Sequence, residues 1–262
     1  MANLIIKNLK FTYDANPVFK DLNFTLKENK TLSIIGISAT GKTTLLKLLN
    51  GELNYDGEIL IDDIIVKPDN FNELRTKIAV VYNNYRFIND TVKEELKYSL
   101  ENMNKSVEEI KDIFNELNEY FGIFKIMNKT MDMLSINEKT LIRILSYAVM
   151  CPTYLAIDDM LINLNNKTKI LLLNYLNSKN ILLINVTSDL EDVIYTDYVL
   201  CLYNGINAVD GKSLDVLKEE KILKRFGFSL PFMVDLSIQL KLYGLIDKIY
   251  LNKEAMVKNL WK

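Results

Sequence analysis

The sequence of 262 residues contains no histidine and only two cysteines. The absence of histidine excludes every mechanism that relies on an imidazole base. Cys151 and Cys201 lie in apolar surroundings and make no metal-binding spacing, so both are expected to be buried, reduced thiols. The chemistry of the chain therefore has to be sought among other side chains.

Long apolar runs and a strong charge are also missing. No stretch approaches the roughly 18 to 20 uninterrupted apolar residues of a membrane span, and the N-terminus, MANLIIKNLK, lacks the apolar core and cleavage site of a signal peptide. A net charge of -2 gives no reason to expect nucleic acid. With 49% hydrophobic and 25% charged residues, we expect a cytoplasmic protein with one sizeable core and a smaller appendage.

Short apolar runs alternate with helical patterns along most of the chain. The apolar run at 32–35 stops at Gly36, and 43–50 then shows the broad apolar face of a helix. Further strand-like runs occupy 4–9, 22–27, 78–82, 154–157, 181–186 and 198–203. Strands that alternate with helices predict an α/β layered domain with a mostly parallel sheet.

Two regions fall outside this alternation. The segment from about 90 to 150 is helical throughout, which predicts a helical subdomain inserted in a domain that spans 1–212. Helical segments at 215–225, 232–243 and 253–261 then predict a small C-terminal extension over 213–262, with a possible part in dimerisation.

A phosphate-binding loop follows the strand at 32–35. The segment from Gly36 to Thr43 fits G-x-x-x-x-G-K-[ST] in full, between a predicted strand and a predicted helix. Backbone N–H groups of such a loop surround phosphate oxygens, Lys42 adds a charge at the β- and γ-phosphates, and the Thr43 hydroxyl ligates Mg²⁺. Ala39 stands at a position that is frequently glycine, at some cost in backbone freedom. A glycine turn without a ligand is the alternative.

The loop therefore predicts ATP and Mg²⁺ as cofactors. The candidate nucleotide-binding residues are Gly36, Ser38, Ala39, Thr40, Gly41, Lys42, Thr43 and Thr44. An acid that holds the Mg²⁺ shell is predicted at the end of a later strand, where Asp158 follows the run at 154–157. Two acids after a strand are otherwise typical of a turn or a helix cap. Beside a P-loop, the metal interpretation is favoured.

With these motifs the chain resembles ABC ATPases, and more narrowly the ATPase subunits of energy-coupling-factor transporters. Tyr13 stands where the family's aromatic residue stacks on adenine, although a core aromatic is an alternative. Leu134 and Ser135 open the position of the signature motif, 24 residues before Asp158. The tail segments 226–236 and 254–261, which include Trp261, are similar to those of the same ATPases.

The resemblance implies a P-loop NTPase fold of the ABC type. Its parts are a mixed, mostly parallel sheet, an antiparallel β subdomain, the inserted helical subdomain and a small helical C-terminal extension. The resemblance also implies that Ser135 contacts nucleotide held by an opposite subunit.

The signature motif departs from the family pattern. The family has L-S-G-G-Q where this chain has L-S-I-N-E over 134–138. Ile136 and Asn137 thus replace glycines that let the backbone approach a γ-phosphate, and Glu138 adds a like charge. Binding across that site is expected to be weakened.

Four further positions of the hydrolytic machinery differ. The glutamate that polarises the attacking water is Asp159, one methylene shorter, and a displacement of about 1 Å can cost on the order of a hundredfold in rate. The switch histidine is Ser188, and the Q-loop glutamine, near the metal, is Asn83. Asn165 replaces the D-loop aspartate. ATP binding is therefore expected to persist while hydrolysis is reduced; a working enzyme altered by mutational drift is the alternative.

Three functions follow from these expectations. The first is a transport ATPase subunit that pairs with a second ATPase chain, most simply as a heterodimer, and docks on a membrane T component with its substrate-binding S component. This subunit would work at the cytoplasmic face of the membrane in uptake of a vitamin or another micronutrient. The second is a nucleotide-gated scaffold that leaves hydrolysis to its partner. The third is a soluble P-loop kinase or GTPase.

Overall fold

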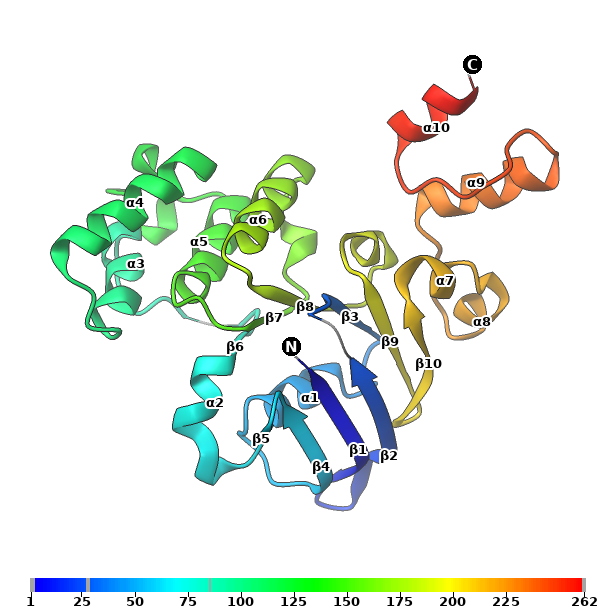
Figure 1. Cartoon of the computed structure of the whole chain (residues 1–262), viewed down its shortest axis with the longest axis horizontal. Coiled ribbons are helices and arrows are strands. Elements are labelled where there is room, and N and C mark those ends of the chain that lie inside the picture. Colours follow the sequence, from blue (N-terminus) through cyan, green and yellow to red (C-terminus); the bar gives the residue numbers. More distant parts are fainter. Residues whose placement is uncertain (1–2, 27–28, 85, 261–262) are drawn as a thin grey trace.

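A computed structural model describes residues 3–26, 29–84 and 86–260 (Figure 1). Two sheets form its centre. The strands of the antiparallel sheet run in the order β2-β1-β4-β5, and those of the larger sheet in the order β10-β9-β3-β8-β7-β6. The first sheet contains β1 (Leu4–Tyr13), β2 (Asn16–Leu26), β4 (Asp56–Ile61) and β5 (Ile64–Ile65). The second contains β3 (Leu32–Ile35), β6 (Ile78–Val81), β7 (Tyr154–Asp158), β8 (Leu182–Thr187), β9 (Tyr198–Tyr203) and β10 (Ile206–Lys212).

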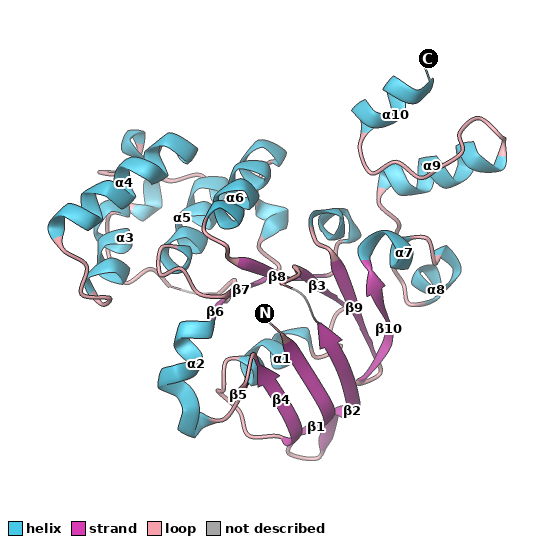
Figure 2. Ribbon diagram, viewed as in Figure 1, coloured by secondary structure: helices cyan, strands magenta, loops and turns pink. Residues whose placement is uncertain are grey.

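The larger sheet is parallel except for β10, which pairs with β9 in the antiparallel sense. Every residue of β3, β6 and β7 is buried, which is why these strands read as apolar runs in the sequence. Helix α1 (Lys42–Leu49) lies between the two sheets (Figure 2), and its leucines pack on apolar side chains from both. The expected α/β fold with an antiparallel β subdomain is confirmed.

Helices fill most of the connections from β5 to β9. The α-helices are α2 (Phe71–Lys77), α3 (Val92–Glu101), α4 (Val107–Phe121), α5 (Ile136–Ala148) and α6 (Asn166–Ser178), and short 3-10 turns lie at Pro68–Asn70, Ile123–Lys125, Met131–Met133, Leu161–Asn163 and Leu190–Tyr195. Helices α3, α4 and α5 each begin with a capping box, in which a Ser or Thr side chain and a Glu three residues later satisfy the first backbone N–H groups. The segment between 90 and 150 is helical, as its sequence pattern indicates.

Among the described residues, four short helices follow β10. They are α7 (Ser213–Leu217), α8 (Glu220–Arg225), α9 (Phe232–Leu242) and α10 (Lys253–Leu260). The single helix expected at 215–225 is wrong, because Glu219 leaves the helical conformation with ψ 53° and separates α7 from α8. Figure 1 shows α9 and α10 on the side of the molecule away from α3 and α4. Trp261, part of the predicted tail motif, lies outside the described residues.

One local expectation changes with the structure. Cys201 is a buried thiol in β9, but Cys151 is exposed, because it follows the end of α5 in a surface turn with φ 50°. Both cysteines are free. Among the described residues, no helix is long and apolar enough to cross a membrane.

Candidate functional site

The loop between β3 and α1 is held in shape by its glycines. Gly41 has φ 93°, and a Cβ atom there would lie 2.6 Å from Val18 Cγ1 and 2.9 Å from Phe19 Cζ. A Cβ atom on Gly36 would lie 2.2 Å from the Thr40 hydroxyl oxygen. Glycine is therefore required at both positions for the loop to pack on β2 and on itself.

Lys42 is folded onto the loop that it follows. Its side chain is buried, and Nζ donates hydrogen bonds to the carbonyl oxygens of Gly36 at 2.6 Å and Ile37 at 3.1 Å. Burial lowers the pKa of Lys42, while the carboxylates of Asp159 and Asp158 act in the opposite direction. The ammonium group thus lies against the backbone of a loop of the type that binds anions through its N–H groups.

Thr43 and Asp158 meet at the start of α1. The Thr43 hydroxyl donates to Asp158 Oδ2 at 2.8 Å, which joins the P-loop helix to the end of β7. Asp158 is buried, and this burial raises its pKa, whereas the Thr43 hydrogen bond lowers it. A hydroxyl and a carboxylate side by side fit the oxygen ligands of Mg²⁺. No group of three or more acidic, Cys or His side chains that could hold a metal occurs among the described residues.

Lys42 and Thr43 line a cleft of about 330 Å³. Its walls are formed by Tyr13, Val18, Ser38, Ala39, Thr40, Gly41, Lys42, Thr43, Thr44 and Asp159. Tyr13 is 40% exposed on the rim and packs edge-on against Phe11, with ring centroids 4.7 Å apart. It lies outside the core, and its stacking on adenine stays a prediction. A neighbouring cavity of about 490 Å³ shares part of the loop and extends the cleft towards Tyr203.

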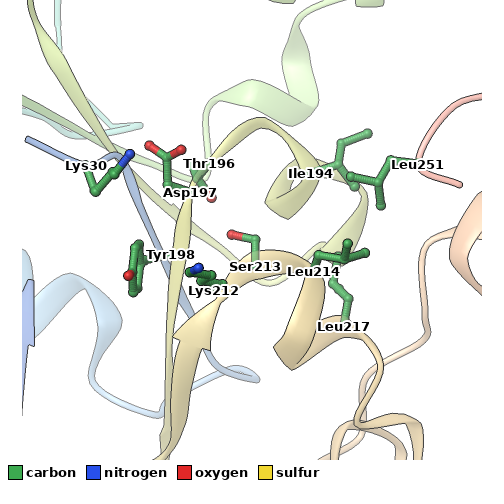
Figure 3. A pocket seen from close by; sticks show the side chains of 10 residues that line it. All are labelled: Lys30, Ile194, Thr196, Asp197, Tyr198, Lys212, Ser213, Leu214, Leu217 and Leu251. Carbon is green, nitrogen blue, oxygen red and sulfur yellow. The ribbon is translucent and has the colours of Figure 1, made fainter. Parts of the chain in front are cut away.

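A third cavity, of about 410 Å³, lies elsewhere (Figure 3). It opens near the amino ends of β3 and β9, and its lining includes Lys30, Asp197 and Lys212. Ile194 and Leu251 face each other at its other end. The P-loop lies at the opposite ends of these parallel strands, so this cavity is separate from the candidate site.

Asp159 and Ser188 are brought together at the end of β7. Asp159 takes a positive φ of 47°, and its Oδ1 atom accepts from the Ser188 backbone N–H at 3.1 Å and from the Ser188 hydroxyl at 3.5 Å. The predicted hydrolytic acid and the predicted switch residue are therefore in contact. The contact holds the carboxylate in place, but serine supplies no titratable charge beside it.

The family model described as ABC transporter matches residues 19–161, just over half of the chain. This chain belongs to the ABC transporter family. The Energy-coupling factor transporter ATP-binding protein EcfA of Aster yellows witches'-broom phytoplasma is 30% identical over 259 residues, which cover 97% of this chain and 95% of that protein. The EcfA of Malacoplasma penetrans is 28% identical over 265 residues, 98% of this chain and 92% of that protein. These matches identify an ATP-binding subunit of the energy-coupling-factor type.

A solved structure supports the same fold. The ABC subunit cbiO1 from Clostridium perfringens, described as part of the ABC transporter complex cbiONQ, aligns with a TM-score of 0.74 and 23% identity over 85% of this chain and 93% of its own. At that identity the likeness concerns the fold alone. The fold and the family expected from the sequence are thus both confirmed.

Two predicted residues of this ABC subunit lie away from the cleft. Ser135 is the N-cap of α5, and Asn83 is exposed just after β6, where its carbonyl oxygen accepts from the Arg143 guanidinium at 2.6 Å. Neither is among the described residues that line the cleft. The structure therefore does not bring Asn83 to Thr43 and Asp158, and a role for it at the metal stays a prediction.

Sequence reasoning missed two residues near the site. Val18 of β2 lines the cleft, but an apolar side chain in a strand carries no signal of such a role. Tyr82 donates its hydroxyl to Glu52 Oε1 at 2.6 Å, and burial together with this carboxylate raises the pKa of Tyr82. Tyr82 is thus a neutral hydrogen-bond donor just after β6, the strand that pairs with β7.

Proposed function

We propose that this ABC subunit binds ATP with Mg²⁺ in the cleft of the P-loop. The contact between Thr43 and Asp158 supports the proposal, because a hydroxyl and a carboxylate lie side by side at the start of the helix that also carries the buried Lys42. Lys42 would exchange its carbonyl partners for phosphate oxygens. Thr43 and Asp158 would hold Mg²⁺, which would supply neutralisation of the phosphate charge.

The chain would work within an energy-coupling-factor transporter that takes up a vitamin or another micronutrient. The names of its relatives support the assignment to an energy-coupling-factor transporter. The partners would be a second ATPase chain in a heterodimer, a membrane T component and a substrate-binding S component, at the cytoplasmic face of the membrane. Closure of the ATPase pair on ATP would move helices of the T component.

Replacement of Lys42 tests nucleotide binding directly. We expect the purified chain to bind ATP–Mg²⁺ with a dissociation constant on the micromolar scale, worth about 8 kcal/mol. Lys42→Ala should abolish binding in isothermal titration calorimetry, since it removes the cation at the loop. Lys47→Ala, in the last turn of the same helix, should bind like the wild type. Retained binding by Lys42→Ala would reject the site.

A catalytically impaired, nucleotide-gated scaffold is the second candidate function. It is favoured by the contact between Asp159 and Ser188, in which both hydrolytic positions carry altered side chains. The isolated chain should then show very low ATPase activity. An Asp159→Asn variant that leaves the ATPase rate of the assembled transporter unchanged would favour the scaffold; a large loss of rate would favour an enzyme.

A further inference from the structure

The signature segment of this chain makes hydrogen bonds to itself. Glu138 Oε2 accepts from the backbone N–H of Ser135 at 2.8 Å and from the Ser135 hydroxyl at 2.7 Å. The Ser135 hydroxyl oxygen in turn accepts from the Glu138 N–H at 3.2 Å. Both donors of Ser135 are therefore taken up by a carboxylate of the same chain.

The charge of Glu138 also matters at this position. The hydrogen bonds from Ser135 lower the pKa of Glu138, which keeps the side chain ionised at neutral pH. The N-terminus of a helix attracts anions through its unpaired N–H groups and its dipole. An anion supplied by the chain itself thus occupies the end of α5 and repels a second one.

A second set of contacts fastens the D-loop to the same helical turn. Asn137 Oδ1 accepts from the backbone N–H of Asn165 at 2.8 Å, and Asn137 Nδ2 donates to the Thr168 hydroxyl at 3.3 Å. Asn165 Oδ1 caps α6 by accepting from the Thr168 N–H at 2.9 Å. Glycine at position 137 could make neither side-chain contact. Replacements that read as losses in the sequence therefore form intramolecular contacts in the fold.

Ile136 adds bulk at the same place. Its side chain is 69% exposed in the first turn of α5, where a glycine would leave the backbone open. One small surface at the start of α5 carries the bulk of Ile136, the contacts of Asn137 and the charge of Glu138. All three oppose the close approach of a phosphate group to Ser135.

We propose that the N-terminal end of α5, which carries the signature, is closed to nucleotide by its own side chains. This inference rests on the pairing of two ATPase chains in the proposed function. This subunit accepts ATP in its P-loop cleft but offers no phosphate contacts to a nucleotide on the chain opposite. The surface fits a different ATPase chain whose own signature is open, and not a second copy of this chain.

Helix α4 provides a matched control for the capping box itself. Its Ser106 and Glu109 repeat the geometry, with Ser106 N–H donating to Glu109 Oε2 at 2.8 Å and Glu109 N–H donating to the Ser106 hydroxyl at 3.2 Å. The box in α4 is part of an ordinary helix start. Only in α5 does the box coincide with the signature and adjoin the D-loop.

The release rate of a fluorescent nucleotide tests the proposal with the full-length chain. The probe is mant-ATP with Mg²⁺, chased by excess ATP in a stopped-flow instrument over a range of protein concentrations. The wild type should release it in a single fast phase at every concentration. Asn137→Gly combined with Glu138→Gln should add a phase at least about tenfold slower, whose amplitude grows with protein concentration, since opened signatures would hold nucleotide between two copies.

Controls separate this inference from the proposed function. Glu109→Gln should behave like the wild type. Glu138→Gln alone keeps a hydrogen-bond acceptor for Ser135 and should show a smaller slow phase. If circular dichroism shows that the double variant misfolds, this single variant still tests the proposal. A slow phase already present in the wild type, or absent from both folded variants that bind mant-ATP, would overturn the closed signature. Absence of mant-ATP binding in every protein would instead reject the P-loop site.

Discussion

Ala39 is a single residue under backbone strain in the phosphate loop. It has φ 63°, a left-handed conformation that costs a residue with a Cβ atom about 1 to 2 kcal/mol. Ala39→Gly removes this cost. It also raises the conformational entropy of the unfolded chain, which lowers the free energy of the unfolded state by about 0.4 to 1 kcal/mol. We expect the variant to raise the free energy of unfolding by about 0.5 kcal/mol in urea titrations.

Ala79 is the control for Ala39, because it lies buried in β6 and is not among the residues of positive φ. Ala79→Gly should lower the free energy of unfolding by about 1 kcal/mol, since glycine weakens a strand interior. If both variants were destabilised alike, strain at Ala39 would be ruled out.

Asp158 is a residue whose ionisation opposes folding. Because burial raises its pKa, the folded chain binds its proton more readily than the unfolded chain does. Asp158→Asn should therefore stabilise the nucleotide-free chain by about 1 kcal/mol at pH 7 and abolish the Mg²⁺-dependent part of ATP binding.

The pH dependence of Asp158→Asn follows from the same shift. Above the pKa that Asp158 has in the folded chain, its ionised carboxylate lowers the free energy of unfolding by the full amount. This destabilisation is lost as the pH falls through that pKa towards the ordinary value of 3.8. The difference in free energy of unfolding between Asp158→Asn and the wild type should therefore shrink as the pH falls. Urea titrations at a series of pH values measure it, and a difference that widened in acid would contradict this account of Asp158.

At the scale of elements, one buried ion pair joins α6 to the 3-10 turn after Ser188. Lys169 Nζ lies 2.5 Å from Asp192 Oδ1, with side chains 10% and 2% exposed. Lys169→Met should lower the free energy of unfolding by about 3 to 5 kcal/mol, because it leaves the Asp192 charge buried and unpaired. Chemical denaturation measures the loss.

Two further variants test whether the loss of stability comes from the unpaired buried charge. Lys169→Met with Asp192→Leu should recover most of the stability, since no buried charge remains. Lys97→Met breaks an ion pair with Glu101 whose side chains are 43% and 53% exposed, so it should cost less than about 1 kcal/mol. Equal losses at the buried and exposed pairs would refute the desolvation argument.

At the scale of the whole molecule, ATP should stabilise both sheets together. The cleft takes Tyr13 and Val18 from the antiparallel sheet and the P-loop from the end of parallel β3. Ligand at about 100 times its dissociation constant adds about 2.7 kcal/mol, which corresponds to a rise of about 5 to 10 °C in melting temperature. Differential scanning calorimetry should show this rise for the wild type and none for Lys42→Ala. A shift retained by Lys42→Ala would place the nucleotide elsewhere.

Contiguous patterns made much of the fold predictable. The parallel strands are apolar runs because both their faces are covered, and the P-loop is a local motif between one such strand and α1. The strands at 56–61, 64–65 and 206–212 were missed, since they are short or half-exposed. Cys151 was misjudged, because apolar neighbours in sequence do not bury a residue in a surface turn.

The sequence by itself determined the phosphate loop, the absence of a histidine base and the altered signature, because each is a matter of residue type at neighbouring positions. Only the tertiary structure decided which distant side chains meet. The Thr43 contact with Asp158, the Asp159 contact with Ser188 and the Asn137 contact with Asn165 all join separate segments of chain. Such contacts depend on strand order and helix packing, which bring together residues that no local pattern links. The segment 134–138, which reads as merely degraded in the sequence, makes hydrogen bonds within itself and to Asn165 and Thr168 in the fold.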